Sequence, residues 1–102
     1  PSKEVGKNVN YREVLNDAEV AAGKFLGDPN KSIESRVVEG GGAYIKSLDR
    51  SIEDLLSKGS LDSADMQKIQ MLMNRRKEMF DLVSNIMNMF HQMSMTPINH
   101  LR

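Results

Sequence analysis

"IQMLMNRRKEMFDLVSNIMNMFHQM", residues 69–93, carries a row of mostly apolar side chains at alternating steps of three and four residues. This spacing is the seam that a coiled coil or a helical hairpin buries against a neighbouring helix. The pattern therefore predicts one long helix, from about residue 63 to residue 93. The members of the row are Ile69, Leu72, Arg76, Met79, Val83, Ile86, Phe90 and Met93.

Further apolar rows lie beside this seam, formed by Met66, Met73, Phe80 and Met87 and by Leu82 and Met89. The resulting apolar arc is too wide for one neighbouring helix. Either the rest of the chain covers it within a monomeric bundle, or other copies of the chain do. The segment from residue 82 to residue 101 has no Lys, Arg, Asp or Glu, which favours assembly because a charge is costly to bury. We expect an assembly or partner interface at Met73, Phe80, Leu82, Met87, Met89, Phe90 and Met93.

The stretch "SLDSAD", residues 60–65, predicts a tight turn in front of the long helix. Gly59 suits the end of one helix, while Asp62 suits the N-cap of the next with Asp65 as its third helical residue. A short connection makes consecutive helices fold back antiparallel. We expect the preceding helix over residues 43–58. The predicted hairpin core places Ile45, Leu48, Ile52 and Leu55 against Ile69, Leu72, Met79, Val83 and Ile86.

An additional helix is predicted near the N-terminus, capped by Asn10 together with Glu13 and ended by Gly27 and Pro29. Residues 30–42 are ambiguous, and the glycines at 40–42 predict a hinge because glycine loses much entropy inside a helix. The sequence thus indicates an all-α fold, a helical hairpin with a long C-terminal helix plus an extra N-terminal helix. Residues 1–42 would form that helix and a flexible linker, and residues 43–102 the hairpin assembly domain.

Composition excludes several classes of protein. A chain of 102 residues allows one small domain of marginal stability, and the absence of cysteine excludes disulfides and thiolate metal sites. No apolar run has the length of a membrane span, and no basic start precedes an apolar run, so we expect neither a direct membrane span nor a cleavable signal peptide. The formal net charge is zero. The basic run "NRRK" at 74–77 lacks interleaved aromatic residues, so we expect it to pair with Glu53, Asp54 or Asp81 and predict no nucleic-acid partner.

No catalytic motif stands out in the sequence. A Ser, His and acid set, paired carboxylates and a phosphate-binding glycine loop are all missing, so we expect no enzyme. Met87, His91 and Met95 follow one another at four-residue steps, and thioether and imidazole groups suit copper(I). Core packing produces the same spacing. We therefore expect no metal and no cofactor.

The stretch "LLSKGSLDSADMQKIQ" at 55–70, the pair Ser84 and Asn85, and the ending "INHLR" resemble the needle and inner-rod proteins of bacterial type III secretion systems. The resemblance covers residues 43–102. The prolines usual in the turn of that family are missing from residues 59–65, and residues 1–42 have no needle counterpart. The extra N-terminal helix is more similar to an inner rod or a related secreted filament.

This resemblance implies a structural subunit that is made in the bacterial cytoplasm and exported without a cleavable signal peptide. Such a subunit assembles helically through its C-terminal helix, in the secretion apparatus or at the cell surface. Its partners would be copies of itself and other apparatus components or a chaperone. The alternative is a small helical chaperone or adaptor that binds a partner helix of a secretion system. The hairpin substrates of type VII secretion rank lower, because their tryptophan-x-glycine turn needs a tryptophan that this chain does not have.

Overall fold

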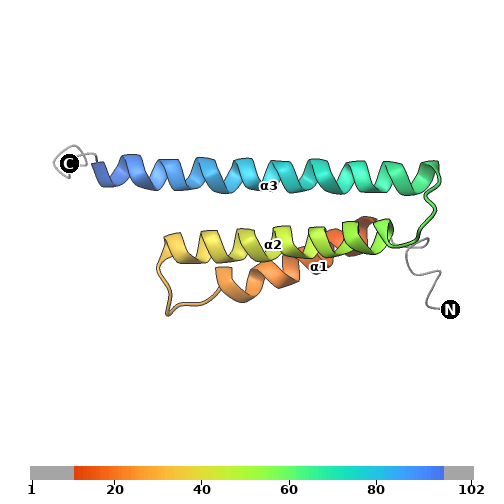
Figure 1. Cartoon of the computed structure of the whole chain (residues 1–102). Coiled ribbons are helices and arrows are strands. Elements are labelled where there is room, and N and C mark those ends of the chain that lie inside the picture. Colours follow the sequence, from red (N-terminus) through yellow and green to blue (C-terminus); the bar gives the residue numbers. More distant parts are fainter. Residues whose placement is uncertain (1–10, 96–102) are drawn as a thin grey trace.

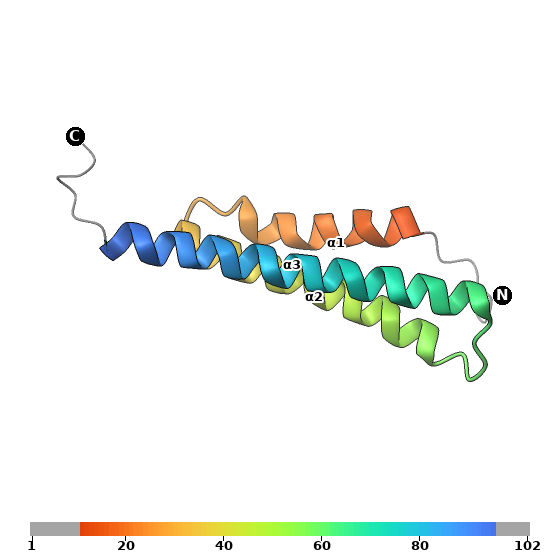
Figure 2. The same ribbon diagram turned by 90° about the horizontal axis from the view of Figure 1, so that it is seen from above.

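The computed structural model describes residues 11–95, which form three helices and no strand. They are α1 (Tyr11–Leu26), α2 (Ile33–Leu56) and α3 (Ser63–Met95). Helices α1 and α2 lie side by side, and α3 folds back along α2 (Figure 1). The last turns of α3 extend past the beginning of α2 and the end of α1 (Figures 1 and 2). The predicted all-α fold, with a hairpin, a long C-terminal helix and an extra N-terminal helix, is confirmed.

The turn between α2 and α3 has the predicted chemistry. Gly59 adopts a left-handed backbone with φ of 82°, which glycine tolerates without steric cost. The Asp65 amide donates to Asp62 Oδ1 at 2.8 Å, while the Asp62 amide donates to Asp65 Oδ2 at 3.1 Å. Lys58 Nζ also donates to Asp65 Oδ2, at 2.5 Å. The buried Asp65 carboxylate therefore ties the end of α2 to the beginning of α3.

The Asp65 carboxylate makes the stability of this turn dependent on pH. The hydrogen bond from Lys58, followed by that from the Asp62 amide, lowers the pKa of Asp65. A carboxylate whose pKa is lowered by folding stabilises the folded state, and this stabilisation is complete above about pH 4, the ordinary pKa of aspartate. The stabilisation is lost as the pH falls through the pKa of the folded state. We expect Asp65→Asn to unfold more easily than the wild type at neutral pH, and the difference to shrink on acidification.

Urea unfolding curves recorded between neutral and acidic pH measure this difference. Asp54→Asn, which changes an exposed carboxylate on α2, controls for the loss of one negative charge. A difference between wild type and Asp65→Asn that stays constant down to the lowest pH contradicts the assignment.

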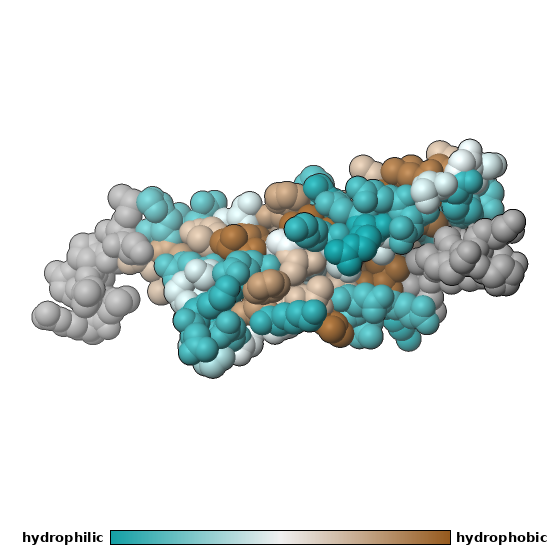
Figure 3. Space-filling view, turned by 60° about the horizontal axis from the view of Figure 1, so that its bottom comes forward, coloured by the Kyte–Doolittle hydropathy of each residue, from teal (hydrophilic) through white to brown (hydrophobic). Residues whose placement is uncertain are grey.

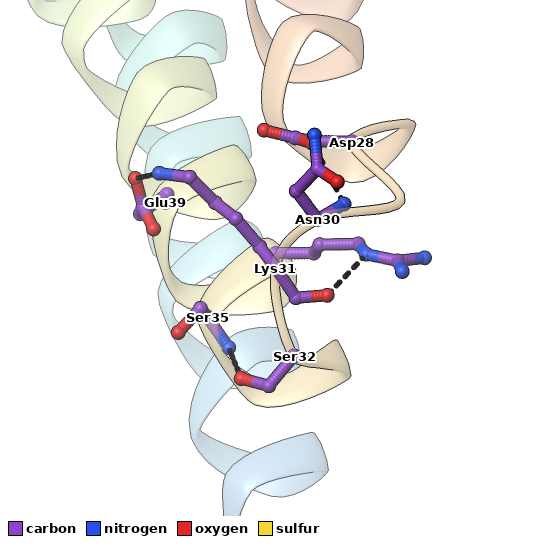
Figure 4. A network of polar contacts seen from close by, with 7 residues as sticks. Asp28, Asn30, Lys31, Ser32, Ser35 and Glu39 are labelled. Carbon is purple, nitrogen blue, oxygen red and sulfur yellow. Dashed lines mark hydrogen bonds and ion pairs between the residues drawn. The ribbon is translucent and has the colours of Figure 1, made fainter.

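Helix α2 begins ten residues earlier than predicted, at Ile33 instead of residue 43. Ser32 is its N-cap, and the Ser32 hydroxyl oxygen accepts a hydrogen bond from the Ser35 amide at 3.1 Å. Figure 4 shows this cap beside the ion pair of Lys31 with Glu39, in which Lys31 Nζ lies 2.5 Å from Glu39 Oε1. The three glycines at 40–42 lie inside the helix, so the prediction of a hinge and flexible linker is wrong. The predicted cap at Asn10 lies outside the described residues.

Close helix packing explains two of these glycines. A Cβ atom on Gly40 would lie 2.7 Å from Cγ of Leu26 on α1. A Cβ atom on Gly41 would collide with Cγ2 of Val83 on α3. Each glycine costs the helix about 1 kcal/mol relative to alanine, and the close approach of both neighbouring helices offsets that cost. The local cost is visible in the sequence, whereas the tertiary gain depends on Leu26 and Val83, which are distant in the chain.

The buried core includes all three helices. Of the predicted hairpin core, Leu48, Leu55 and Leu72 are fully buried, with exposed fractions of 0%, 0% and 1%. The other predicted members are half-buried, namely Ile45, Ile52, Ile69, Met79, Val83 and Ile86. The prediction omitted Tyr44, which is buried on α2, and the contribution of α1, which is Val14, Ala18 and Ala22. Helix α1 thus packs on the hairpin as part of the same core.

Candidate assembly surface

Helical spacing places the apolar side chains of α3 outside the seam on two opposite flanks. The first flank lies beside α2 on the side away from α1, and the second lies on the side of α1. The predicted interface residues divide between them. Met73, Phe80 and Met87 lie on the first flank, Leu82, Met89 and Met93 on the second, and the half-buried Phe90 continues the seam that faces α2.

The first flank joins α2 in an apolar surface that we call the open face. Figure 2 shows α1 on one side of the pair formed by α2 and α3, with no helix on the other side. Met73 is 56% exposed and Phe80 47%. On α3 the side chains recur at seven-residue steps, which stack on one side of a helix, and on α2 three members do the same, followed by Leu56 one turn further on. The open face consists of Val38, Ile45, Ile52 and Leu56 on α2 and Met66, Met73, Phe80 and Met87 on α3.

An ion pair crosses the open face between its two helices. Arg76 Nε donates to Asp49 Oδ1 at 2.6 Å, and the Arg76 guanidinium lies 5.0 Å from the centre of the Phe80 ring. Arg76 was the one polar member of the predicted seam, and this pairing satisfies it at the edge of the seam. In Figure 3, hydrophobic side chains reach the surface at several separate places, with hydrophilic ones between them.

A groove of about 430 Å³ runs between α1 and α3 on the second flank. Ala22 and Leu26 of α1 form one wall, and the other wall is formed by Met79, Leu82 and Ile86 of α3. The floor is the backbone of the two glycines at 40 and 41, together with Tyr44 and Val37. Glu19, an exposed residue at the rim, is the one charged residue in the lining. The groove is therefore an apolar surface bounded by helices on three sides.

A polar contact joins α1 to α3. Arg75 hydrogen-bonds to Tyr11, and this contact raises the pKa of the Arg75 guanidinium. Burial raises the pKa of the nearby Tyr44 phenol. At neutral pH the Arg75 guanidinium is therefore charged and the Tyr44 phenol neutral, as usual for these groups. The Nε atom of Arg75 is buried and has no hydrogen-bond partner in the part of the chain that the structure describes. This contact links α1 to α3.

The basic run at 74–77 is neutralised within the chain. Lys77 Nζ lies 2.9 Å from Asp81 Oδ2, as predicted. Arg75 Nη1 lies 3.3 Å from Glu78 Oε1. Arg76 pairs with Asp49, which lies about one helical turn before the predicted Glu53 and Asp54 on α2. These pairs leave no concentrated positive surface on this part of α3.

The two described side chains of the methionine and histidine set considered for copper differ in their exposure. Met87 is half-buried, His91 is exposed, and the side chain of Met95 lies outside the described residues. Within residues 11–95, no group of three or more His, Asp or Glu side chains has the geometry to hold a metal ion. No described helix is long and apolar enough to cross a membrane.

No family model matches the sequence, and neither a curated protein nor a solved structure is significantly similar to it.

Proposed function

We propose that this chain is a structural subunit of a bacterial protein-secretion apparatus and self-assembles helically through α3. The observation that carries the proposal is the open face. It combines apolar side chains of two helices along the length of the hairpin, and five of its eight members are large hydrophobic residues at least 47% exposed. Exposed apolar side chains gathered on one face in this way mark interaction sites in soluble proteins.

The chemistry of the open face suits repeated contacts between copies. Three of its four α3 members are methionines, whose unbranched side chains adapt to irregular surfaces and to more than one partner. A contact between two different patches of the same chain generates a helical filament when its rotation does not close. The open face supplies one such patch.

The secretion context of the proposal comes from the resemblance of residues 43–102 to needle and inner-rod proteins. In this context the chain is made in the bacterial cytoplasm, is exported without a cleaved signal peptide, and resides in the apparatus or at the cell surface. Its partners are further copies of itself and other apparatus components or a chaperone.

A small helical chaperone or adaptor is the second candidate, and the groove between α1 and α3 favours it. An apolar groove bounded by helices accepts the apolar side of an amphipathic helix. A chaperone of this kind would stay monomeric at every concentration until its partner is added.

Met73→Asp tests the assembly role of the open face. Met73 is 56% exposed, so a carboxylate at this position stays hydrated in the monomer. In a contact between copies the carboxylate would lose its water and gain no partner of opposite charge. We expect the wild type to form particles larger than a dimer as its concentration rises, and Met73→Asp to form none. Light scattering after size-exclusion chromatography measures the mass, negative-stain microscopy shows the particle shape, and circular dichroism checks that the variant is folded.

Val20→Asp is the matched control, because Val20 is 62% exposed but lies on α1, away from the open face. It should assemble like the wild type. Equal loss of assembly in both variants, or a wild type that never exceeds a dimer, contradicts the proposal. Export is tested separately in a bacterium that carries a type III system, where disabling the apparatus should keep the chain inside the cell.

A further inference from the structure

The groove between α1 and α3 has no occupant among the described residues, and α3 itself carries a matching surface. We propose that the groove of one copy receives the end of α3 of a second copy, in an antiparallel dimer with two-fold symmetry. The inference rests on the proposed function in one respect, that α3 makes contacts between copies. It assigns the dimer to the flank opposite the open face.

The apolar wall of the groove continues into the end of α3. Leu82, Ile86, Met89 and Met93 follow one another at steps of four, three and four residues, so they form one seam along the helix. We call them the groove-side row. Leu82 and Ile86 line the groove. Met89 and Met93 continue the row and are 55% and 64% exposed.

An antiparallel pairing of two such rows has a register that fills both grooves. When Ile86 of one copy lies opposite Met89 of the second, Leu82 lies opposite Met93 of the second copy. Because Leu82 and Ile86 form the groove wall, this register brings the exposed end of each α3 into the groove of the other copy. The same contacts repeat across the two-fold axis, which is the commonest symmetry among soluble oligomers.

The near absence of charge on both surfaces favours a second copy of this chain as the occupant. The part of α3 from residue 82 to residue 95 carries no Lys, Arg, Asp or Glu, so two such segments meet without repulsion. Glu19, the one charged residue of the groove lining, is exposed at the rim and can stay in water. A helix of another protein with charges on its contact side would lose hydration and gain no partner elsewhere in this groove. The uncharged end of the chain's own α3 fits the groove better.

The extent of the contact predicts a weak dimer. The groove-side row covers 12 residues of α3, which is roughly 18 Å of helix at 1.5 Å per residue. Stable interfaces bury about 800 Å² per partner, and a single helix of this length reaches that area only with the added walls of α1 and α2. The dimer should therefore form reversibly, between micromolar and millimolar concentrations.

Sedimentation equilibrium over this concentration range compares Met89→Asp with Met73→Asp. The two methionines are equally exposed, at 55% and 56%, and lie on opposite flanks of α3. We expect Met89→Asp to raise the dissociation constant of the dimer at least about tenfold, because the new carboxylate would be buried in the groove. Met73→Asp should dimerise like the wild type while it blocks larger assembly.

These outcomes separate the two proposals. A dimer without larger particles supports the inference and contradicts the proposed helical assembly. A Met89→Asp variant that dimerises as tightly as the wild type overturns the inference, whether or not larger particles form. A wild type that stays monomeric up to millimolar concentration overturns the inference.

Cysteine cross-linking tests the register, since the chain has no cysteine of its own. Leu82→Cys mixed with Met93→Cys should give a disulfide-linked heterodimer under mild oxidation, while neither variant should cross-link to itself. Self-cross-linking of either variant indicates parallel helices and overturns the antiparallel arrangement. Circular dichroism and native mass before oxidation establish that both variants fold and dimerise.

Discussion

Leu72→Ala is expected to lower the free energy of unfolding by about 2–5 kcal/mol, the usual cost of a cavity at a fully buried leucine. Leu72 is 1% exposed and belongs to the same buried cluster as Leu48 and Leu55 of α2 and Val14 of α1. It is the one fully buried apolar side chain that α3 contributes within the described residues. Because small domains are stable by only about 5–15 kcal/mol, this loss is a large part of the total. Urea unfolding followed by circular dichroism measures it.

Met71→Ala provides the matched control, since Met71 is the preceding residue on α3 and is 41% exposed. Its truncation removes a flexible side chain at the surface and should change the free energy of unfolding by less than about 0.5 kcal/mol. Similar losses for the two variants would mean that α3 does not direct Leu72 into the core.

Gly41→Ala and Gly42→Ala are expected to change stability in opposite directions although they are neighbours. A methyl group on Gly41 collides with Val83 Cγ2, and Val83 is β-branched and has little rotamer freedom in a helix. Overpacking costs about 1–3 kcal/mol, so the loss exceeds the gain of about 1 kcal/mol in helix propensity. A methyl group on Gly42 meets nothing within 4 Å. Gly42→Ala should therefore gain about 0.5–1 kcal/mol.

Val83→Ala combined with Gly41→Ala completes this comparison. The smaller side chain on α3 makes room for the new methyl group, so the double variant should lose less stability than the sum of the two single variants. Urea unfolding of the four proteins gives the coupling free energy. Additive losses would show that the helices α2 and α3 do not meet at these two residues.

The hairpin was predictable because its signals are local. The three-four spacing of residues 69–93 and the cap formed by Asp62 and Asp65 need only nearby residues to be interpreted. The continuity of α2 through its glycines was not predictable in this way, since the compensating contacts come from Leu26 and Val83, which are distant in sequence. One local signal was available, because Ser32 follows Pro29 closely and suits an N-cap.

The sequence predicted which residues of α3 are exposed and apolar, but not that they belong to two separate surfaces, the open face and the groove. Met73 and Met89 both belong to apolar rows of α3, and both are exposed. Which flank faces α1 depends on the side of the hairpin on which α1 packs, and the spacing within α3 carries no information about that side. The groove depends in addition on the absence of side chains at Gly40 and Gly41, whose role became apparent only from the packing.

The two glycines also link positions that would otherwise vary independently during evolution. Gly40 meets Leu26 of α1, and Gly41 meets Val83 of α3, so consecutive residues of α2 each share a fixed volume with a different helix. A larger residue at 41 is tolerated only with a smaller one at 83, and the same holds for positions 40 and 26. Among relatives of this chain, these positions should therefore covary as two separate pairs, with the summed volume of each pair held nearly constant.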